Sequence, residues 1–212
     1  YVFQGWTCEE LGITTPVQTV VIPVDFTGDL TLRAHYVAAA ASVISNGVTT
    51  YYVSLMEAWT AAQSGDTIQL LADIAAPGLV IDKDITIDFN NHTYAVNYAI
   101  GSTGTETLGL QLLNGYNVVL KNGSLTATYD LNVQGKPVRM LIQNYANLTM
   151  DNMVLTANDN TLYCLSINSG NVVVTNSTIT AAEGKCAFDA CKYGSYEAPV
   201  VVATNCTITG IV

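Results

Sequence analysis

The feature that most constrains the fold is a short pattern that occurs five times. An alternating apolar run ends at an Asn and is followed by a second short run that ends in a hydrophobic residue and Thr. The copies read ITIDFNNHTY (85–94), VVLKNGSLT (118–126), LTMDNMVLT (148–156), VVVTNSTIT (172–180) and VVATNCTIT (201–209). The closing asparagines of the last four copies are 24 to 30 residues apart. Strand-like units at this period predict a stack that builds its core one layer at a time.

Alternation within the runs places their apolar residues on one face. The first run contributes Ile85/Ile87, Val118/Leu120, Leu148/Met150, Val172/Val174 and Val201/Ala203; the second contributes Leu125, Leu155, Ile179 and Ile208. A third run precedes the copies and contributes Leu110/Leu112, Met140/Ile142, Leu165/Ile167 and Phe188/Ala190. Three strands per repeat, always in the same order, predict an all-β fold. We expect a right-handed parallel β-helix with strands about 4.8 Å apart.

The asparagine column is predicted to be structural. Asn tolerates left-handed backbone geometry, and its amide can bond to the copies above and below. The predicted members are Asn91, Asn122, Asn152, Asn176 and Asn205. The residues before them form a second column, so Lys121 is expected between the carboxylates of Asp88 and Asp151. Such an exposed ladder contributes about 0.5 kcal/mol per contact and helps to fix the register.

An amphipathic helix is expected at the N-terminal side of the stack. Ser54 and Glu57 form a capping box, and Leu55, Ala58, Trp59 and Ala62 share one helical face that ends before Gly65. A stack exposes a hydrophobic end, and Trp59 is expected to cover it.

The chain divides into three predicted parts: residues 1–36 form a small β-rich unit, 37–48 a linker, and 49–212 the repeats. An Ala-rich run in the linker (38–41) lacks strand alternation and allows a short helix. The last predicted strand has no capping element after it. We therefore expect either that the natural protein continues or that another subunit stacks end to end on this coil.

The composition excludes several function classes. The net charge is −10 and only 11% of residues are charged. Without a basic run, nucleic acid is not an expected partner. The sequence contains no uninterrupted apolar stretch of about 18 residues, so membrane insertion is not expected. The five cysteines lack a CxxC pair, so neither a metal nor a cofactor is indicated, and Cys164 with Cys186 is the first pair to test for a disulfide.

Two stretches resemble known families. YVFQGW (1–6) and TGDLTLRAHY (27–36) resemble the C-terminal half of the Listeria–Bacteroides repeat, of the internalin B-repeat type, although Arg33 and Tyr36 replace its usual aromatic and Trp. YVSLMEAWTAAQSGDTIQLLAD (52–73) and IDKDITIDFNNHT (81–93) resemble right-handed β-helix, pectate-lyase-like repeat proteins of gut bacteria, with Asn91 in place of the usual Gly. The first resemblance implies a spacer, and the second an adhesin-like surface protein.

A catalytic set is not evident in the sequence. Enzymes on the fold that the second resemblance implies hold calcium with clustered Asp and remove a proton with Arg or Lys. The candidate residues are Asp151 and Arg139, with Asp82, Asp84, Asp88, Asp130 and Lys136 as further acids and bases. Asp82 and Asp84 flank Lys83 on a turn, as in a solvated bend, and Arg139 is expected to point outward near Lys121 or Asp151. Tyr129, Tyr193 and Tyr196, on insertions that lengthen single layers, are candidates for stacking against sugar rings or for covering an edge.

Three functions therefore remain open. The leading hypothesis is a non-enzymatic structural or adhesion module, extracellular and on a bacterial cell surface, which binds glycans or host surface proteins through projecting loops. The second is a carbohydrate-active β-helix enzyme, either a polysaccharide lyase or a glycosidase. The third is a structural subunit of a phage fibre or another extracellular filament.

Overall fold

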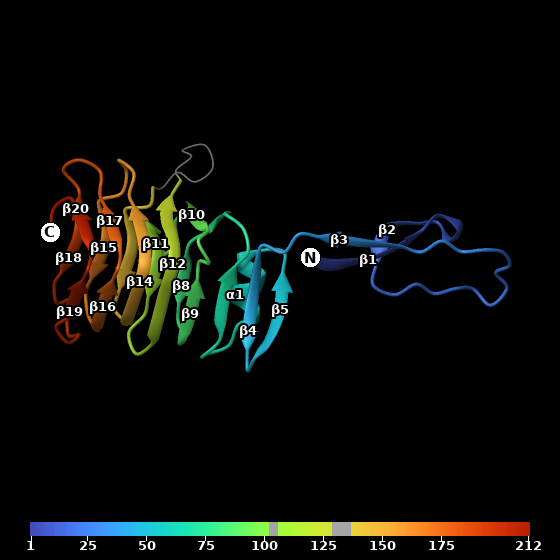
Figure 1. The fold of residues 1–212 in the computed structure, drawn as a ribbon, viewed down its shortest axis with the longest axis horizontal. Coiled ribbons are helices and arrows are strands. Elements are labelled where there is room, and N and C mark those ends of the chain that lie inside the picture. Colours follow the sequence, from blue (N-terminus) through green and yellow to red (C-terminus); the bar gives the residue numbers. More distant parts are fainter. Residues whose placement is uncertain (102–105, 129–136) are drawn as a thin grey trace.

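The computed structural model describes residues 1–101, 106–128 and 137–212, and these form mainly β-strands (Figure 1). The first three strands make a small antiparallel sheet in the order β2-β1-β3, from β1 (Val2–Cys8), β2 (Ile13–Val17) and β3 (Arg33–Val37). A 3-10 helix η1 (Glu9–Leu11) joins β1 to β2.

A five-stranded parallel sheet carries the run that precedes each Asn-closed copy. Its strands, in order, are β8 (Leu79–Ile81), β11 (Leu108–Leu112), β13 (Met140–Asn144), β15 (Tyr163–Ile167) and β18 (Cys186–Ala190). Each strand pairs in parallel with the strand one repeat away.

A twelve-stranded sheet carries both runs of the Asn-closed copies. Its main path is β5 (Val48–Tyr52), β4 (Ala41–Ser45), β6 (Thr67–Leu70), β9 (Ile85–Asp88), β12 (Asn117–Ala127), β14 (Asn147–Thr156), β16 (Asn171–Thr175) and β19 (Val200–Thr204). Beside it lie β7 (Ile74–Pro77), β10 (Thr93–Tyr98), β17 (Thr178–Thr180) and β20 (Thr207–Thr209). The pairs of β4 with β5 and β6 are antiparallel and the others are parallel.

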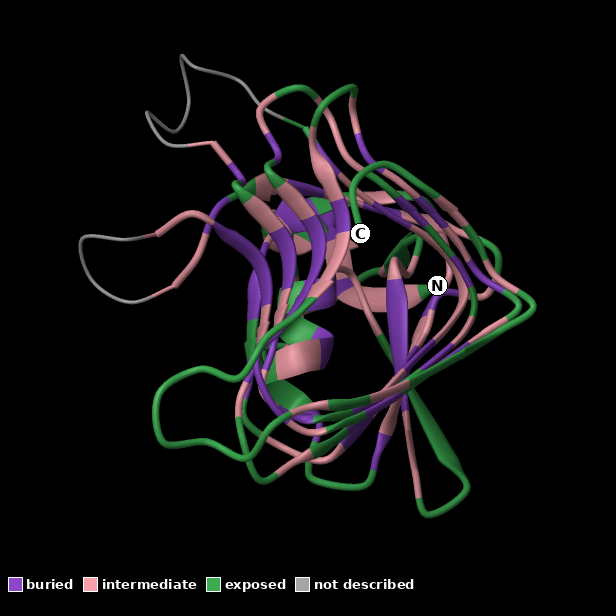
Figure 2. Cartoon of the chain, turned by 90° about the vertical axis from the view of Figure 1, so that its left-hand side faces the viewer, coloured by how far each residue is buried: buried purple, intermediate pink, exposed green. Residues whose placement is uncertain are grey.

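In the twelve-stranded sheet, the predicted stacking of the apolar positions is confirmed by the strand registers. Ile87 lies opposite Leu120, Leu120 opposite Met150, and Met150 opposite Val174. These side chains and those of the five-stranded sheet belong to one buried core. Viewed along the stack, most buried residues lie on the strands, and the projecting loops are largely exposed (Figure 2).

The bend between the two runs is made by one residue. Asn122, Asn152, Asn176 and Asn205 have positive φ of 60°, 52°, 51° and 56°. β12 and β14 continue through this bend. β12 therefore pairs with both β9 and β10 of the preceding layer, and β14 with both β16 and β17 of the following layer. Asn is suited to the position because its side chain tolerates the left-handed region.

The helix α1 (Leu55–Ala61) begins at the predicted cap. The Ser54 hydroxyl accepts a hydrogen bond of 3.2 Å from the Glu57 backbone N–H, and Leu55 and Ala58 are buried. Trp59 is half-buried and packs against the core. The helix ends at Ala61, before Gly65, because Ala62 already has extended backbone angles. The helix has seven residues, and no helix in the described part of the chain is long and apolar enough to cross a membrane.

Two local predictions are wrong. The segment predicted as a linker (37–48) contains β4, which pairs with both β5 and β6, since Asn46 and Gly47 form the tight turn of a β4–β5 hairpin. The predicted inward residue Met140 is only half-buried, whereas Leu141 and Ile142 are both fully buried. The reason is that the N–H groups of Arg139 and Met140 share the Thr107 carbonyl oxygen, which interrupts the alternation as a β-bulge does.

The five cysteines are free. Cys186 lies opposite Tyr163, so it is one residue out of register with Cys164. Burial raises the pKa of the Cys164 thiol to about 11.

Candidate functional site

The asparagine column carries a chain of side-chain hydrogen bonds between layers. Asn122 donates to Asp88 at 3.1 Å, and Asn152 donates to Asn122 at 3.3 Å. Asn176 then donates to Asp151 at 2.8 Å, and Asn205 donates to Asn176 at 2.7 Å.

In the first layer, Asp88 takes the place in this chain of hydrogen bonds that was predicted for Asn91. Asn91 has a φ of 64° and bonds through its backbone N–H to the Asn122 carbonyl oxygen at 2.7 Å. The inserted Phe89, which is fully buried, lengthens this turn.

Lys121 lies between two carboxylates, as predicted. It is in register with Asp88 on one side and Asp151 on the other, and its Nζ is 3.5 Å from Asp88. Hydrogen bonds from the side chains of Thr175 and Asn176 lower the pKa of Asp151, and its charge interaction with Lys121 adds to this.

A second column, at the start of the same strands, was not predicted. Asp84 accepts hydrogen bonds from the backbone N–H and the side-chain amide of Asn117, at 2.7 and 3.2 Å. Asn147 donates to Asn117 at 3.1 Å, and the Asn171 backbone N–H donates to Asn147 at 3.1 Å. The available signal was an Asn or Asp directly before each of the first four apolar runs. Asp84 is thus a structural acceptor.

The two candidate catalytic residues are not brought together. Asp151 lies on β14 of the twelve-stranded sheet, whereas Arg139 precedes β13 of the five-stranded sheet. Arg139 is exposed, and its backbone bonds to Thr107 and Leu162. Within the residues that the structure describes, no hydrogen bond or ion pair joins Arg139 to Asp151 or Lys121, and no group of three His, Cys, Asp or Glu side chains is placed to hold a metal. Asp130 and Lys136 lie outside the described residues.

Two of the candidate tyrosines meet a third that the sequence did not single out. The Tyr145 ring centroid is 5.2 Å from that of Tyr196 and 6.0 Å from that of Tyr193. Tyr193 and Tyr196 are 59% and 40% exposed, and Tyr145 is half-buried. Burial, followed by the nearby Tyr193, Tyr196 and Cys191, raises the pKa of Tyr145. We call Tyr145, Tyr193 and Tyr196 the tyrosine cluster. Tyr129 lies outside the described residues.

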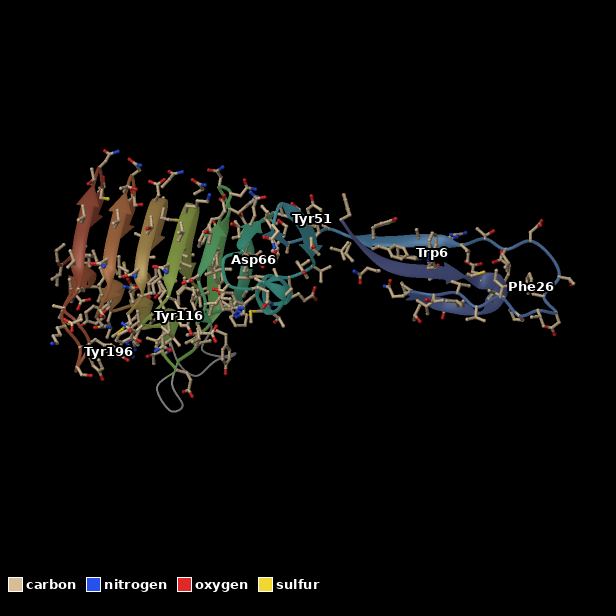
Figure 3. All side chains as sticks on the ribbon, turned by 90° about the horizontal axis from the view of Figure 1, so that it is seen from below. Trp6, Phe26, Tyr51, Asp66, Tyr116 and Tyr196 are labelled. Carbon is tan, nitrogen blue, oxygen red and sulfur yellow. The ribbon has the colours of Figure 1, made fainter. Side chains whose placement is uncertain are left out.

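The cluster is assembled by a loop that reaches back across the layers. Residues 191–199 follow β18, whereas Tyr145 follows β13, two strands away in the same sheet. The Tyr193 N–H donates to the Asn168 carbonyl oxygen at 3.2 Å, and the Ser169 hydroxyl donates to the Glu197 carbonyl oxygen at 3.0 Å. The loop is therefore attached to the intervening layer, and Tyr196 lies on the same side of the stack as Tyr116 (Figure 3).

A buried amide holds the turn that presents Tyr145. Asn144 is 0% exposed and lies between Leu112 and Ile167 in an otherwise apolar column. Its side-chain N–H group donates to the carbonyl oxygens of Ala146 at 2.9 Å and Ser169 at 3.2 Å. Asn144 thus joins the turn after β13 to the turn on which loop 191–199 is attached.

A shallow apolar hollow lies on the outer side of α1. It has a volume of about 470 Å³ and is lined by Tyr52, Met56, Glu57, Thr60 and Ala61. Its single charged side chain, Glu57, belongs to the first turn of the helix. Its other polar side-chain groups are the hydroxyls of Tyr52 and Thr60.

Comparison with known proteins gives no relative. No protein-family model matches the chain, and neither a curated protein nor a solved structure matches it significantly.

Proposed function

We propose that this chain is an adhesion module of a bacterial surface protein and that it binds glycans through the tyrosine cluster. The observation that carries the proposal is the meeting of Tyr145 with Tyr193 and Tyr196 at ring distances of 5.2 and 6.0 Å. Aromatic rings offer sugars an apolar face and a hydroxyl group for hydrogen bonding. Side chains on loops that a rigid scaffold supports are common binding elements.

The module is proposed to be a right-handed parallel β-helix, as the resemblance to pectate-lyase-like repeat proteins implies. The parallel registers of successive layers and the repeated asparagine bend support this winding. The β2-β1-β3 sheet is proposed to be part of a spacer of the B-repeat type. An experimental structure in which successive layers wind in the left-handed sense would contradict the β-helix proposal.

The proposed activity is binding without catalysis. Asp151 accepts hydrogen bonds from Thr175 and Asn176, while Arg139 directly precedes β13 of the other sheet. A lyase requires its acid, base and metal ligands around one sugar ring. Depolymerisation of a polysaccharide by the purified chain, lost in Asp151→Asn, would overturn this part of the proposal.

A glycan array probed with the purified chain tests the binding proposal. We expect the double variant Tyr193→Ala/Tyr196→Ala to lose the glycans that the unaltered chain binds. Tyr98→Ala is the matched control, because Tyr98 is 50% exposed and lies on β10, outside the cluster. Equal binding by the double variant and the control would reject the cluster as the glycan site, and an array without any bound glycan would reject glycan binding.

A further inference from the structure

The tyrosine cluster has a chemical property that does not depend on glycan binding. Tyr145 is far in the sequence from Tyr193 and Tyr196, and its contacts with them are the only ring contacts between two tyrosines within the described residues. The other ring pairs there, Phe3–Trp6, Phe3–Tyr36 and Phe89–Tyr94, each contain at most one phenol.

We propose that Tyr145 and Tyr196 are the site of an intrachain dityrosine cross-link, formed when the chain meets hydrogen peroxide and a haem peroxidase. Tyr193 is the second partner for Tyr145. The cross-link ties loop 191–199 covalently to the turn after β13.

The reaction balances as a two-electron oxidation. Each phenol gives up one electron and its hydroxyl proton and becomes a phenoxyl radical. The two radicals join through ring carbons next to the hydroxyl groups, and each of these carbons then passes its hydrogen to the phenol oxygen. The chain loses two hydrogen atoms in total, and one peroxide molecule takes up the two electrons and two protons as two molecules of water.

The geometry favours coupling within the chain over coupling between chains. Tyr196 is exposed enough to react with an oxidant in solution, and the half-buried ring of Tyr145 is 5.2 Å away and tilted by 50°. The loop is already attached through Ser169 and Asn168, so little chain entropy is lost when the bond forms. The longer distance and the T-shaped arrangement of Tyr193 make it the lesser partner.

Exposed phenols elsewhere give the experiment its internal controls. Tyr98 is 50% exposed and Tyr1 is 85% exposed. They meet the oxidant as readily as the cluster does, but within the described residues neither ring contacts another phenol. Their coupling would have to join two separate molecules.

Oxidation of the dilute whole chain tests the proposal. The cysteines are first alkylated, because a free thiol such as Cys191 would reduce the radicals. Horseradish peroxidase and peroxide are then added, and dityrosine is followed by its fluorescence. The monomer is then separated on a denaturing gel. Its mass is expected to be lower by two hydrogen atoms, and its digest to contain one cross-linked peptide pair, which joins Tyr145 to Tyr196.

Phenylalanine variants assign the two partners. Tyr145→Phe is expected to lose the intrachain product, and Tyr196→Phe to keep a smaller amount that maps to Tyr193. Tyr98→Phe is expected to leave the yield unchanged. The proposal is overturned if Tyr145→Phe keeps the intrachain yield, if the cross-link maps to other tyrosines, or if the oxidised chain gives only dimers. The double variant Tyr193→Phe/Tyr196→Phe, which leaves Tyr145 in place, must also lose the product.

Discussion

Lys83 contacts Trp59 in two ways: its Nζ lies 4.3 Å from the centroid of the indole ring and donates a hydrogen bond of 3.3 Å to the Trp59 carbonyl oxygen. The same Nζ donates to the Ala62 carbonyl oxygen at 2.9 Å. These carbonyls lie at the C-terminal end of α1, where a cation offsets the partial negative charge of the helix. A side chain from the turn before β9 therefore attaches the helix to the first layers of the stack.

Lys83→Met is expected to lower the free energy of unfolding by about 1–2 kcal/mol, because it removes a cation–π contact and two hydrogen bonds to helix carbonyls. Urea unfolding followed by Trp59 fluorescence, in a Trp6→Phe background, measures the change. Lys121→Met is the control, since an exposed ion pair contributes about 0–1 kcal/mol. An equal loss in both variants would show that Lys83 has no special role.

Substitutions at Asn152 separate the bend from the hydrogen-bonded column. Asn152→Ala leaves at a φ of 52° a residue without the short polar side chain that makes this geometry tolerable, and it also loses the bond to Asn122, so we expect a loss of about 2 kcal/mol. Asn152→Gly keeps the backbone freedom and should lose only about 1 kcal/mol. Denaturant midpoints rank the two variants. The reverse order would mean that backbone geometry does not explain the choice of Asn.

Asn144→Leu should loosen the turn that carries Tyr145. The substitution suits the apolar column but leaves the Ala146 and Ser169 carbonyl oxygens without their donor, at a cost of about 1–3 kcal/mol. We expect the raised pKa of Tyr145 to fall toward its ordinary value, which a spectrophotometric titration against a Tyr145→Phe reference detects. Gln143→Leu, on the neighbouring outward position, should leave that pKa unchanged. An unaltered titration in Asn144→Leu would reject the positioning role.

The lowered pKa of Asp151 predicts a loss of stability in acid. The group has a lower pKa in the folded chain than in the unfolded one, so its contribution is present above the ordinary value of 3.8 and is lost as the pH falls through the folded value. Melting temperatures between about pH 5 and about pH 2 should fall less steeply in Asp151→Asn than in the unaltered chain. Parallel curves would show that Asp151 does not couple folding to pH.

The registers of the twelve-stranded sheet could be predicted because the same pattern of residue types recurs in each copy. A hydrophobic alternation and an Asn at one position per layer leave only one way to superpose the copies, and Leu120 lies opposite Met150 as expected. The burial of Leu141 could not be predicted, because a shared carbonyl at Arg139 and Met140 shifts the alternation without any change in composition.

The tyrosine cluster could be predicted only in part. Tyr193 and Tyr196 were recognisable as loop aromatics. The path of the nine-residue connection (191–199), however, cannot be predicted from the residues of that connection alone. Their partner Tyr145 follows a strand directly and has no periodic mark. Asn144 was missed for a related reason. An amide is not expected in an apolar column, and the two carbonyl oxygens that accept its hydrogen bonds are known only from the structure.

The asparagine bend also decides where the chain tolerates a change in length. In β12 and β14 a single residue turns the strand, with nothing between the two runs. A one-residue insertion inside either continuous strand would turn the side chains between it and the next connection from the interior to solvent. The connection from β13 to β14 has two residues, whereas that from β18 to β19 has nine, and the sheets on either side keep their register. New peptides can therefore be grafted between these sheets, but not at the asparagine bends of β12 and β14.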